Sequence, residues 1–289
     1  MKSVCFFSSY YKDDSMPNYV RRYLKELSRH FSELVLLTNE KPISSADTDF
    51  LQSNHITWRL YKNEGYDFGM WHKAFAEFDV DKYDRIGLVN DSCILFASLD
   101  RFFTWADEHP SDYCGFTDNN ARGYHIQSYF LIINKNAIPQ MKKYFSEHGI
   151  FGNQKDIIEI YEIGLSRCLM NAGMKTDAFY SFKDKVSTGD PTIIKAKELI
   201  EKGFPLIKRR ILARNYGDAD YGHLVASGFD ANPWNYIRLI KKVTRDSDTE
   251  KIFEGIAVKK SFLGEWKFRV ICTAAGIYGR LKRINNCAG

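Results

Sequence analysis

The alternation of short apolar runs with segments of helical periodicity is the feature that most constrains the fold. Runs expected to form strands lie at 2–8, 33–38, 55–61, 83–90, 93–96, 112–117, 127–134 and 174–180. Segments expected to form helices lie at 17–31, 67–78, 99–106, 136–147 and 155–172. Because strands joined through helices form βαβ units, this order predicts an α/β fold with a mostly parallel or mixed sheet covered by helices.

Chain length and a change of pattern predict how the chain divides. At 289 residues, the chain is long enough for one large α/β domain, or for one domain with a smaller appendage. The alternation of strands and helices ends near residue 180, and the pattern beyond 190 is mainly helical. We therefore expect an α/β domain over residues 1–215 and a helical, basic C-terminal region over 216–289.

Basic residues gather at the C-terminal end of the chain. Residues 259–289 contain seven Lys or Arg and one Glu, so the remainder is close to neutral although the whole chain has a formal charge of +5. A near-neutral body argues against a nucleic-acid-binding protein, which would normally present a broad basic face. Segment 261–281 is amphipathic as a helix, which fits either binding of an anionic membrane surface through 259–283 or packing on the α/β domain.

Cysteine spacing and hydropathy indicate the compartment. The six cysteines are scattered and form no C-x-x-C pair, which argues against a zinc knuckle or a disulfide framework and fits a reducing compartment. The N-terminal apolar run is shorter than a signal peptide requires, and no uninterrupted run of about 18 apolar residues occurs. We therefore expect a cytoplasmic protein, with peripheral binding to the inner face of the cell membrane as one use of the basic tail.

A polar triplet, Asn90-Asp-Ser92, follows a run expected to be a buried strand, Ile86-Gly-Leu-Val89. Ligands of open α/β sheets bind just outside the carboxyl ends of the strands. A carboxylate at this position, here Asp91, is well placed to hold a divalent cation such as Mg²⁺ or Mn²⁺ against a nucleotide diphosphate. A simple turn is the alternative interpretation, because Asn, Asp and Ser all favour turns.

A second unusual run precedes the second expected helix. Asn63-Glu-Gly-Tyr-Asp-Phe-Gly69 combines a glycine-flanked bend with one carboxylate and an aromatic ring. Asp67 is expected to accept a hydrogen bond from a ribose or a base, or to cap the following helix through its side-chain oxygen, and both roles can coexist. Gly69, together with Ser8 and Tyr10 at the end of the first expected strand, is a further candidate for binding the nucleotide.

Several motifs resemble, in sequence and order, those of the rhamnan synthesis protein F family. They are Gly65-Tyr-Asp-Phe-Gly69, the strand ending in Asn90-Asp-Ser92, Asp112-Tyr-Cys-Gly-Phe116, His125-Ile-Gln-Ser-Tyr-Phe130 and Gly203-Phe-Pro-Leu-Ile-Lys208. Members of this family are bacterial glycosyltransferases of surface-polysaccharide assembly. The resemblance, over about residues 1–215, implies a GT-A-like catalytic domain and a nucleotide-sugar donor, which is dTDP-L-rhamnose in several members. The acceptor would be a growing glycan or a polyprenyl-linked glycan. Met70-Trp71 departs from the family pattern, so the donor pocket is expected to differ there.

The resemblance also implies roles for acidic residues. Enzymes of this fold normally anchor a metal ion through an Asp-x-Asp motif, whereas Asn90-Asp-Ser92 offers one carboxylate, Asp91, between an amide and a hydroxyl. An acid three residues before a leucine on a helix is similar to the pattern of inverting GT-A enzymes. That similarity nominates Glu162 as the general base that deprotonates the acceptor hydroxyl. Glu159 is the second candidate and Asp118 a weaker one, while a solvated acidic face is the alternative for the two glutamates.

Polar residues before the strongest apolar strand and a later basic cluster complete the candidate site. His125, Gln127 and Ser128 suit contacts with sugar hydroxyls, the acceptor or a diphosphate, although loop-to-strand hydrogen bonding would use the same groups. Lys208 is expected to help hold the diphosphate in place of the missing second metal carboxylate. Arg209 is expected to be solvated at the surface.

These features predict a glycosyltransferase with a GT-A-like α/β fold that moves a sugar from a nucleoside diphosphate to a growing glycan. A noncatalytic sugar-nucleotide or glycan-binding protein of the same fold is the main alternative, because the triplet holds a single carboxylate. A nucleotidyltransferase of similar topology is less favoured, because Ser8-Ser-Tyr-Tyr11 lacks the glycine-rich, basic signature expected after the first strand.

Overall fold

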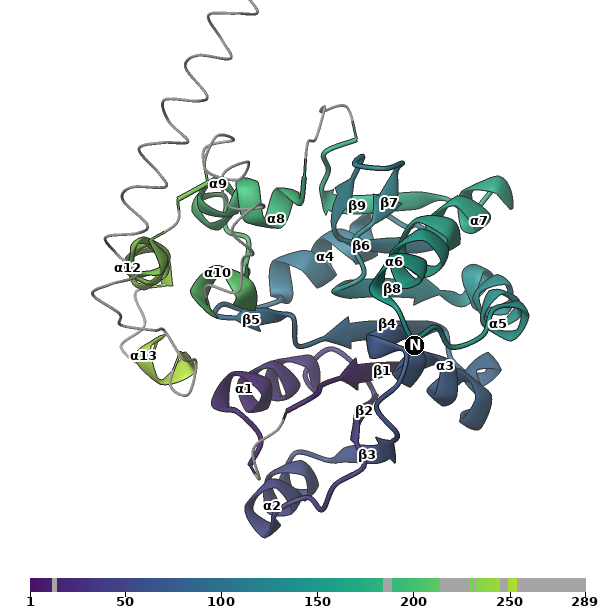
Figure 1. The fold of residues 1–289 in the computed structure, drawn as a ribbon, viewed down its shortest axis with the longest axis horizontal. Coiled ribbons are helices and arrows are strands. Elements are labelled where there is room, and N and C mark those ends of the chain that lie inside the picture. The colour runs from purple at the N-terminus through teal and green to yellow at the C-terminus, as the bar shows by residue number, and fades with distance from the viewer. Residues whose placement is uncertain (12–14, 184–188, 214–228, 231, 245–248, 254–289) are drawn as a thin grey trace, which may run out of the picture.

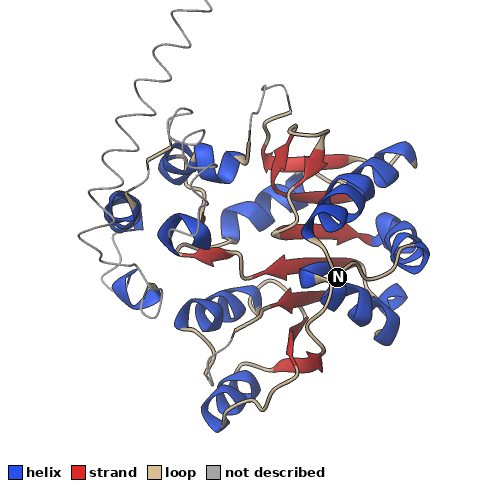
Figure 2. Cartoon of the chain, viewed as in Figure 1, coloured by secondary structure: helices blue, strands red, loops and turns tan. Residues whose placement is uncertain are grey.

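A computed structural model describes residues 1–11, 15–183, 189–213, 229–230, 232–244 and 249–253 (Figure 1). Its centre is an eight-stranded mixed sheet in the described part of the chain, with helices on both sides (Figure 2). The parallel half runs in the order β3-β2-β1-β4. Its strands are β1 (Ser3–Ser8), β2 (Glu33–Asn39), β3 (Ile56–Tyr61) and β4 (Arg85–Asn90).

The second half of the sheet is mostly antiparallel. Beyond β4 the order continues through β8, β6 and β7, each antiparallel to its neighbour, while β9 pairs in parallel with β6. These strands are β6 (Tyr113–Asn119), β7 (His125–Ile126), β8 (Phe130–Asn134) and β9 (Thr176–Tyr180). Strands β1 and β4 end side by side, with Ser8 paired to Asn90, so polar residues of both chain segments meet at one edge.

Alternating side chains of the buried strands form two hydrophobic layers, one on each face of the sheet. On β1, Val4 and Phe6 pack in one cluster, and Cys5 and Phe7 pack in the other. Because both faces are covered, the strand reads as an uninterrupted apolar run rather than an alternating one. The first cluster includes α3 (Tyr66–Glu77), α5 (Ile138–Glu147) and α7 (Leu165–Asn171), and the second includes α1 (Asn18–Leu27) and α4 (Asp100–Glu108).

The chain after β9 returns to the end of β4. A short strand, β10 (Leu206–Lys208), pairs antiparallel with β5 (Cys93–Leu95), directly after the Asn90-Asp-Ser92 triplet. This pairing carries Lys208 and the start of α10 to the edge of the sheet where β1 and β4 end. The helices of this part are α8 (Pro191–Ile194), α9 (Ala196–Glu201), α10 (Arg209–Ala213), α12 (Pro233–Thr244) and α13 (Thr249–Ile252).

The predicted α/β fold is confirmed, with differences in particular elements. The strand expected at 127–134 begins at Phe130, because residues 128 and 129 form a turn, and residues 127–129 line a cavity. The helix expected at 155–172 is α6 (Gln154–Asp156), a π-helix η3 (Ile157–Gly164) and α7. Elements without a sequence expectation are α2 (Ser45–Ser53), η1 (Val80–Lys82), η2 (Lys135–Ala137), β7 and β10.

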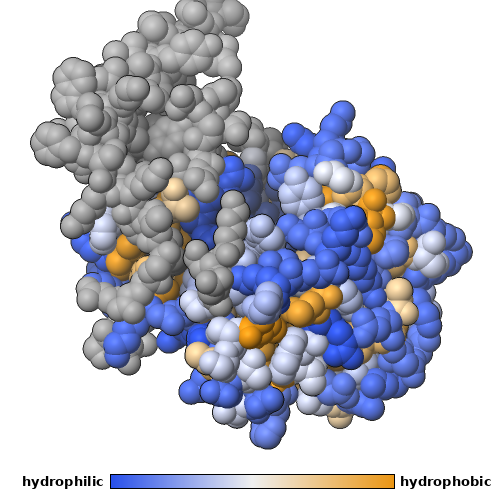
Figure 3. Space-filling model, turned by 60° about the horizontal axis from the view of Figure 1, so that its bottom comes forward, coloured by the Kyte–Doolittle hydropathy of each residue, from blue (hydrophilic) through white to orange (hydrophobic). Residues whose placement is uncertain are grey.

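The surface of the described residues is mainly polar, as in a globular protein (Figure 3). Figure 3 shows a face that is mainly hydrophilic where it is coloured, with apolar side chains confined to small separate areas. Cys5, Cys93 and Cys114 are buried free thiols, as expected from their scattered positions. No helix in the ranges given above has the length and apolarity needed to cross a bilayer. The amphipathic tail at 259–283, with most of the region expected at 216–289, lies outside the described residues.

Candidate functional site

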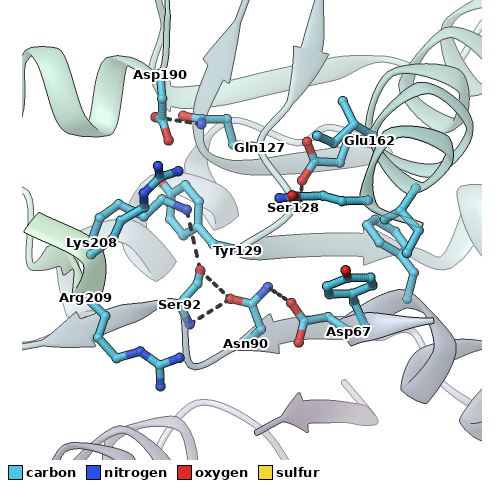
Figure 4. Close-up of a pocket in the computed structure, with 16 residues that line it drawn as sticks. Asp67, Asn90, Ser92, Gln127, Ser128, Tyr129, Glu162, Asp190, Lys208 and Arg209 are labelled. Carbon is cyan, nitrogen blue, oxygen red and sulfur yellow. Dashed lines mark hydrogen bonds between the residues drawn. The ribbon is translucent and has the colours of Figure 1, made fainter. Parts of the chain in front are cut away.

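A cavity of about 390 Å³ lies where β1 and β4 end, a volume within the range of small-molecule sites (Figure 4). Its walls come from segments far apart in the sequence: the start of α3, the β4–β5 turn, the segment before β8, η3, and the β10–α10 junction. The lining residues are Tyr66, Asp67, Phe68, Asn90, Ser92, Gln127, Ser128, Tyr129, Gln154, Ile157, Ile158, Glu162, Asp190, Lys208, Arg209 and Arg210.

A chain of hydrogen bonds forms the floor of the cavity. The Asp67 carboxylate accepts from Ser8 Oγ at 3.1 Å and from Asn90 Nδ2 at 2.7 Å. Asn90 Oδ1 in turn accepts from the backbone N–H and the Oγ of Ser92, at 3.1 and 2.6 Å (Figure 4). The triplet is therefore a turn, as the alternative interpretation proposed, and it presents an amide and a hydroxyl to the cavity.

The entry to α3 explains why Asp67 reaches this floor. Gly65 adopts a left-handed φ of 74°, and a Cβ on Gly69 would lie 1.9 Å from the Glu64 carbonyl oxygen. Only residues without a Cβ permit such a tight entry into the helix. Gly65, and not Asp67, occupies the N-cap position, so the expectation that Asp67 caps the helix is wrong. Gly69 permits the close backbone approach of this turn and does not itself line the cavity.

The surroundings of Asp67 change its protonation. Burial raises the pKa of the Asp67 carboxyl to about 7, and the negative charge of Asp91 raises it further in the same direction. The Ser8 hydroxyl and the cations of Lys208 and Arg209 oppose this shift. Asp67 therefore changes its charge near neutral pH, unlike an ordinary exposed carboxylate.

Asp91, the predicted metal anchor, lies behind the cavity floor. Its Oδ2 accepts hydrogen bonds from Ser9 Oγ at 3.0 Å and Tyr19 OH at 3.2 Å, and forms an ion pair with Arg209 Nη1 at 3.0 Å. Asp91 is 6% exposed and is not among the cavity-lining residues. Arg209 is thus held by a buried carboxylate, which corrects the expectation that it is solvated at the surface.

This donor set does not fit a divalent cation bound at the triplet. Mg²⁺ and Mn²⁺ prefer carboxylate oxygens, yet the triplet residues that line the cavity, Asn90 and Ser92, carry an amide and a hydroxyl. The Asp91 carboxylate already compensates a guanidinium, and the Lys208 ammonium lies 3.4 Å from Ser92 Oγ. Two fixed cations beside the triplet would repel a third positive charge.

Lys208 extends from the end of β10 into the cavity (Figure 4). Its Nζ lies 4.4 Å from the centre of the Tyr129 ring, a cation–π contact that also places it over Ser92. Burial lowers the pKa of Lys208, but acidic neighbours, Cys93 and Asp190 among them, raise it by more. The side chain is therefore a charged ammonium at neutral pH.

Glu162 lies across the cavity from Lys208 (Figure 4). Its Oε1 accepts a hydrogen bond of 2.5 Å from Ser128 Oγ, so the two predicted residues meet in the structure. Glu162 belongs to the π-helix η3, an element that occurs often at functional sites. Glu159 is exposed and contacts Arg122 instead, so of the two candidate glutamates only Glu162 lines the cavity.

Gln127 connects the cavity wall to a residue that sequence reasoning did not single out. Its Oε1 accepts from Thr117 Oγ1 at 2.6 Å, and its Nε2 donates to Asp190 Oδ1 at 2.9 Å. Asp190 also accepts from the backbone N–H of Thr192 as the N-cap of α8. Its Asp-Pro-Thr context signals a helix start, but nothing local shows that the carboxylate faces a cavity.

Besides Asp91 and Gly69, three further predicted site residues are not brought into the cavity. Tyr10 is 42% exposed outside it. His125 is buried in β7, where its Nδ1 lies 2.8 Å from the carbonyl oxygen of Gly123. Asp118 is fully buried and accepts from Ser181 Oγ at 2.6 Å, so it holds the segment after β9. Ser8 contributes indirectly, through its hydrogen bond to Asp67.

Tyr66 is a further lining residue without a sequence expectation. It follows Gly65, has a left-handed φ of 54°, and is 54% exposed. An aromatic ring within Gly65-Tyr-Asp is a weak signal by itself, because its exposure depends on the backbone turn.

Several solved structures resemble this fold at low sequence identity. HddC from Yersinia pseudotuberculosis is 12% identical, with a TM-score of 0.38 over 63% of this chain and 91% of that chain. A cytidylyltransferase from Leptospira borgpetersenii is 13% identical, with a TM-score of 0.40 over 86% of this chain and 96% of that chain. The glycosyltransferase GlyE of Streptococcus pneumoniae is 19% identical, with a TM-score of 0.38 over 70% of this chain and 50% of that chain. None of these similarities is close enough to indicate an activity.

No curated protein matches the chain significantly. The sequence profile described as rhamnan synthesis protein F, in contrast, matches residues 34–250 and so covers most of the chain. The match includes the α3 entry, the triplet, the π-helix and Lys208, and it agrees with the GT-A-like α/β fold expected from the motifs. The chain belongs to the rhamnan synthesis protein F family.

Proposed function

We propose that the protein is a glycosyltransferase that binds a nucleotide-sugar donor in the cavity at the end of β4. The observation that carries the proposal is the division of this cavity, with Lys208 on one side and Glu162 on the other (Figure 4). A donor needs such a division, because its diphosphate is negative whereas its anomeric carbon is attacked by a hydroxyl that must lose a proton.

The floor and rim of the cavity suit the remaining parts of a donor. Asp67 and Asn90 offer a carboxylate and an amide for ribose or sugar hydroxyls. The exposed ring of Tyr66 offers a surface on which a base or a sugar can stack. Membership of the rhamnan synthesis protein F family supports dTDP-L-rhamnose as the donor.

The proposed reaction is an inverting transfer with Glu162 as general base. Ser128 orients the Glu162 carboxylate through its hydrogen bond to Oε1. Gln127 and Ser128 lie on the same wall and suit hydroxyl groups of the donor or the acceptor. The acceptor in this proposal is a growing surface polysaccharide or a polyprenyl-linked glycan, reached on the cytoplasmic face of the membrane with help from 259–283.

Transfer assays with dTDP-L-rhamnose and a panel of UDP- and GDP-sugars test this proposal, with Glu162→Gln as the key variant. Because glutamine keeps the size and the acceptor oxygen but cannot take the proton, transfer should fall by at least about 100-fold. Donor affinity, measured by isothermal titration calorimetry, should stay within about twofold of the wild type. Glu159→Gln is the matched control, since Glu159 lies on the same π-helix outside the cavity and should keep full activity.

The two outcomes that contradict the proposal differ from each other. Full transfer activity in Glu162→Gln would remove Glu162 from the reaction while leaving a glycosyltransferase. Tight donor binding without transfer to any glycan or lipid-linked acceptor would instead favour a noncatalytic sugar-nucleotide-binding protein.

A further inference from the structure

In the part of the chain that the structure describes, the Lys208 ammonium forms no ion pair with a carboxylate, although the charges of Asp190 and Glu162 act on it from a greater distance. Its polar contact is a long one, 3.4 Å to Ser92 Oγ, and its other contact is the face of the Tyr129 ring. Neither group carries a negative charge. A half-buried ammonium that lines a cavity in this way is arranged to receive an anion from outside the protein.

The position of Ser92 in the triplet indicates where on the fold this anion would bind. It is the third residue of the triplet, the position that corresponds to the second acid of an Asp-x-Asp motif. Here its hydroxyl donates to Asn90 Oδ1 and lies beside Lys208. The lysine thus holds its positive charge at the site where a metal ion would otherwise supply one.

The neighbouring Asp91–Arg209 ion pair also argues against a metal ion at the triplet. Asp91 Oδ2 is occupied by Arg209 at 3.0 Å, with two hydroxyl donors on the same oxygen. Recruiting Asp91 to a metal would leave the Arg209 guanidinium without its counterion, next to a dication.

We propose that Lys208, and not a divalent cation, neutralises the leaving diphosphate, so that donor binding and transfer proceed without metal. This inference rests on the proposed glycosyltransferase function. In the transfer step, the bond between the anomeric carbon and the diphosphate oxygen breaks, and its electron pair stays on that oxygen. The acceptor oxygen forms the new bond to the anomeric carbon, and its proton passes to Glu162. Lys208 remains protonated throughout and stabilises the negative charge that develops on the diphosphate.

Calorimetric titration of the full chain with dTDP, UDP and GDP tests the proposal, in EDTA and again with added Mg²⁺ or Mn²⁺. The dissociation constant of the best ligand should change by less than about twofold between the two conditions. Lys208→Met, which keeps most of the length and the apolar stem of the side chain, should weaken binding by about 10- to 100-fold, the range of a charge-assisted hydrogen bond. Lys208→Arg should recover part of this loss, and Lys143→Met, an exposed lysine of α5, should have no effect.

Three results would count against the proposal, and they separate it from the underlying function. Binding that requires Mg²⁺ or Mn²⁺ would overturn metal independence while leaving a nucleotide-sugar site in place. Unchanged affinity in a folded Lys208→Met variant would remove Lys208 from the site. Absence of binding by every nucleoside diphosphate, with and without metal, would overturn the proposed function itself. The wild-type metal comparison decides the question even if Lys208→Met does not fold.

Discussion

Asp67 and Asp91 lie close together but differ in what compensates their carboxylates. Asp91 pairs with Arg209 and with two hydroxyl donors, behind the cavity floor. Asp67 lines the cavity and accepts from a neutral hydroxyl and a neutral amide. At the residue scale, Asp67 is therefore the cavity acid whose pKa is raised to about 7, and Asp91 is a positioning residue for Arg209.

The raised pKa of Asp67 predicts that the stability of the folded protein depends on pH. Because the pKa of Asp67 is raised from 3.8 to about 7 in the folded state, the folded protein binds more protons than the unfolded chain between these values. Stability from this group is therefore greatest below about pH 4, falls as the pH rises and is lost above about pH 7. Asp67→Asn removes this titration, so its free energy of unfolding should rise relative to the wild type by about 4 kcal/mol across the same window. Denaturant titrations of both proteins at several pH values measure this difference.

The contradicting result is a constant difference between Asp67→Asn and the wild type at every pH. A constant offset is expected from the altered hydrogen bonds to Ser8 and Asn90, so only the slope with pH reports the ionisation of Asp67.

Particular elements position the site. The entry to α3 aims Asp67 at β4, the π-helix η3 carries Glu162, and β10 carries Lys208. The α3 entry relies on close backbone approach, since the N–H of Gly69 donates to the carbonyl oxygen of Gly65 at 2.8 Å. At the element scale, the site thus depends on a turn that tolerates no Cβ at Gly69.

Gly69→Ala tests this turn. The new Cβ would lie 1.9 Å from the Glu64 carbonyl oxygen, which is backbone and cannot move without opening the turn. We expect a loss of about 3 kcal/mol in the free energy of unfolding, together with weaker nucleotide binding because Asp67 moves. Thermal and denaturant unfolding measure the first effect, and calorimetry measures the second. Gly149→Ala is the control, since its Cβ would meet nothing within 4 Å, and it should stay within about 0.5 kcal/mol of the wild type. Equal stability of the two variants would contradict the role of the turn.

Across the whole molecule, segments late in the sequence complete the core and the cavity. Tyr236, Ile237 and Ile240 of α12 belong to the same hydrophobic cluster as α1 and α4. Helix α12 is thus packed on the α/β body, although the division expected at residue 215 remains a prediction.

Ile240→Ala tests whether α12 and the α/β body unfold as one unit. Ile240 is fully buried in the shared cluster, so the variant should lose about 2–4 kcal/mol and shift the whole unfolding transition to lower temperature. Val243→Ala, on the same helix but 42% exposed, should change stability by less than about 0.5 kcal/mol. Differential scanning calorimetry distinguishes this outcome from a separate, early transition of α12, which would contradict cooperative packing.

Local pattern was sufficient for much of the fold and for part of the site. The strands and most helices were predicted because apolar runs and helical periodicity are properties of neighbouring residues. The family was predicted from motifs within single segments, and Asn90, Gln127, Glu162 and Lys208 do line one cavity, although their roles stay predictions. His125 belongs to such a motif and Asp118 follows one, but both side chains are buried in the interior, which local pattern does not reveal.

The sequence by itself determined the α/β architecture, the family and the edge of the sheet where polar residues gather. Only the tertiary structure decided which of these side chains face one another. Lys208 meets Ser92 across 116 residues of chain, and Arg209 meets Asp91 across 118, because β10 pairs with β5. That pairing turns Asp91 into the partner of a guanidinium and leaves Lys208 in the cavity. Its physical reason is long-range packing, which fixes the direction of a side chain at a strand end and is not encoded in the residues beside it.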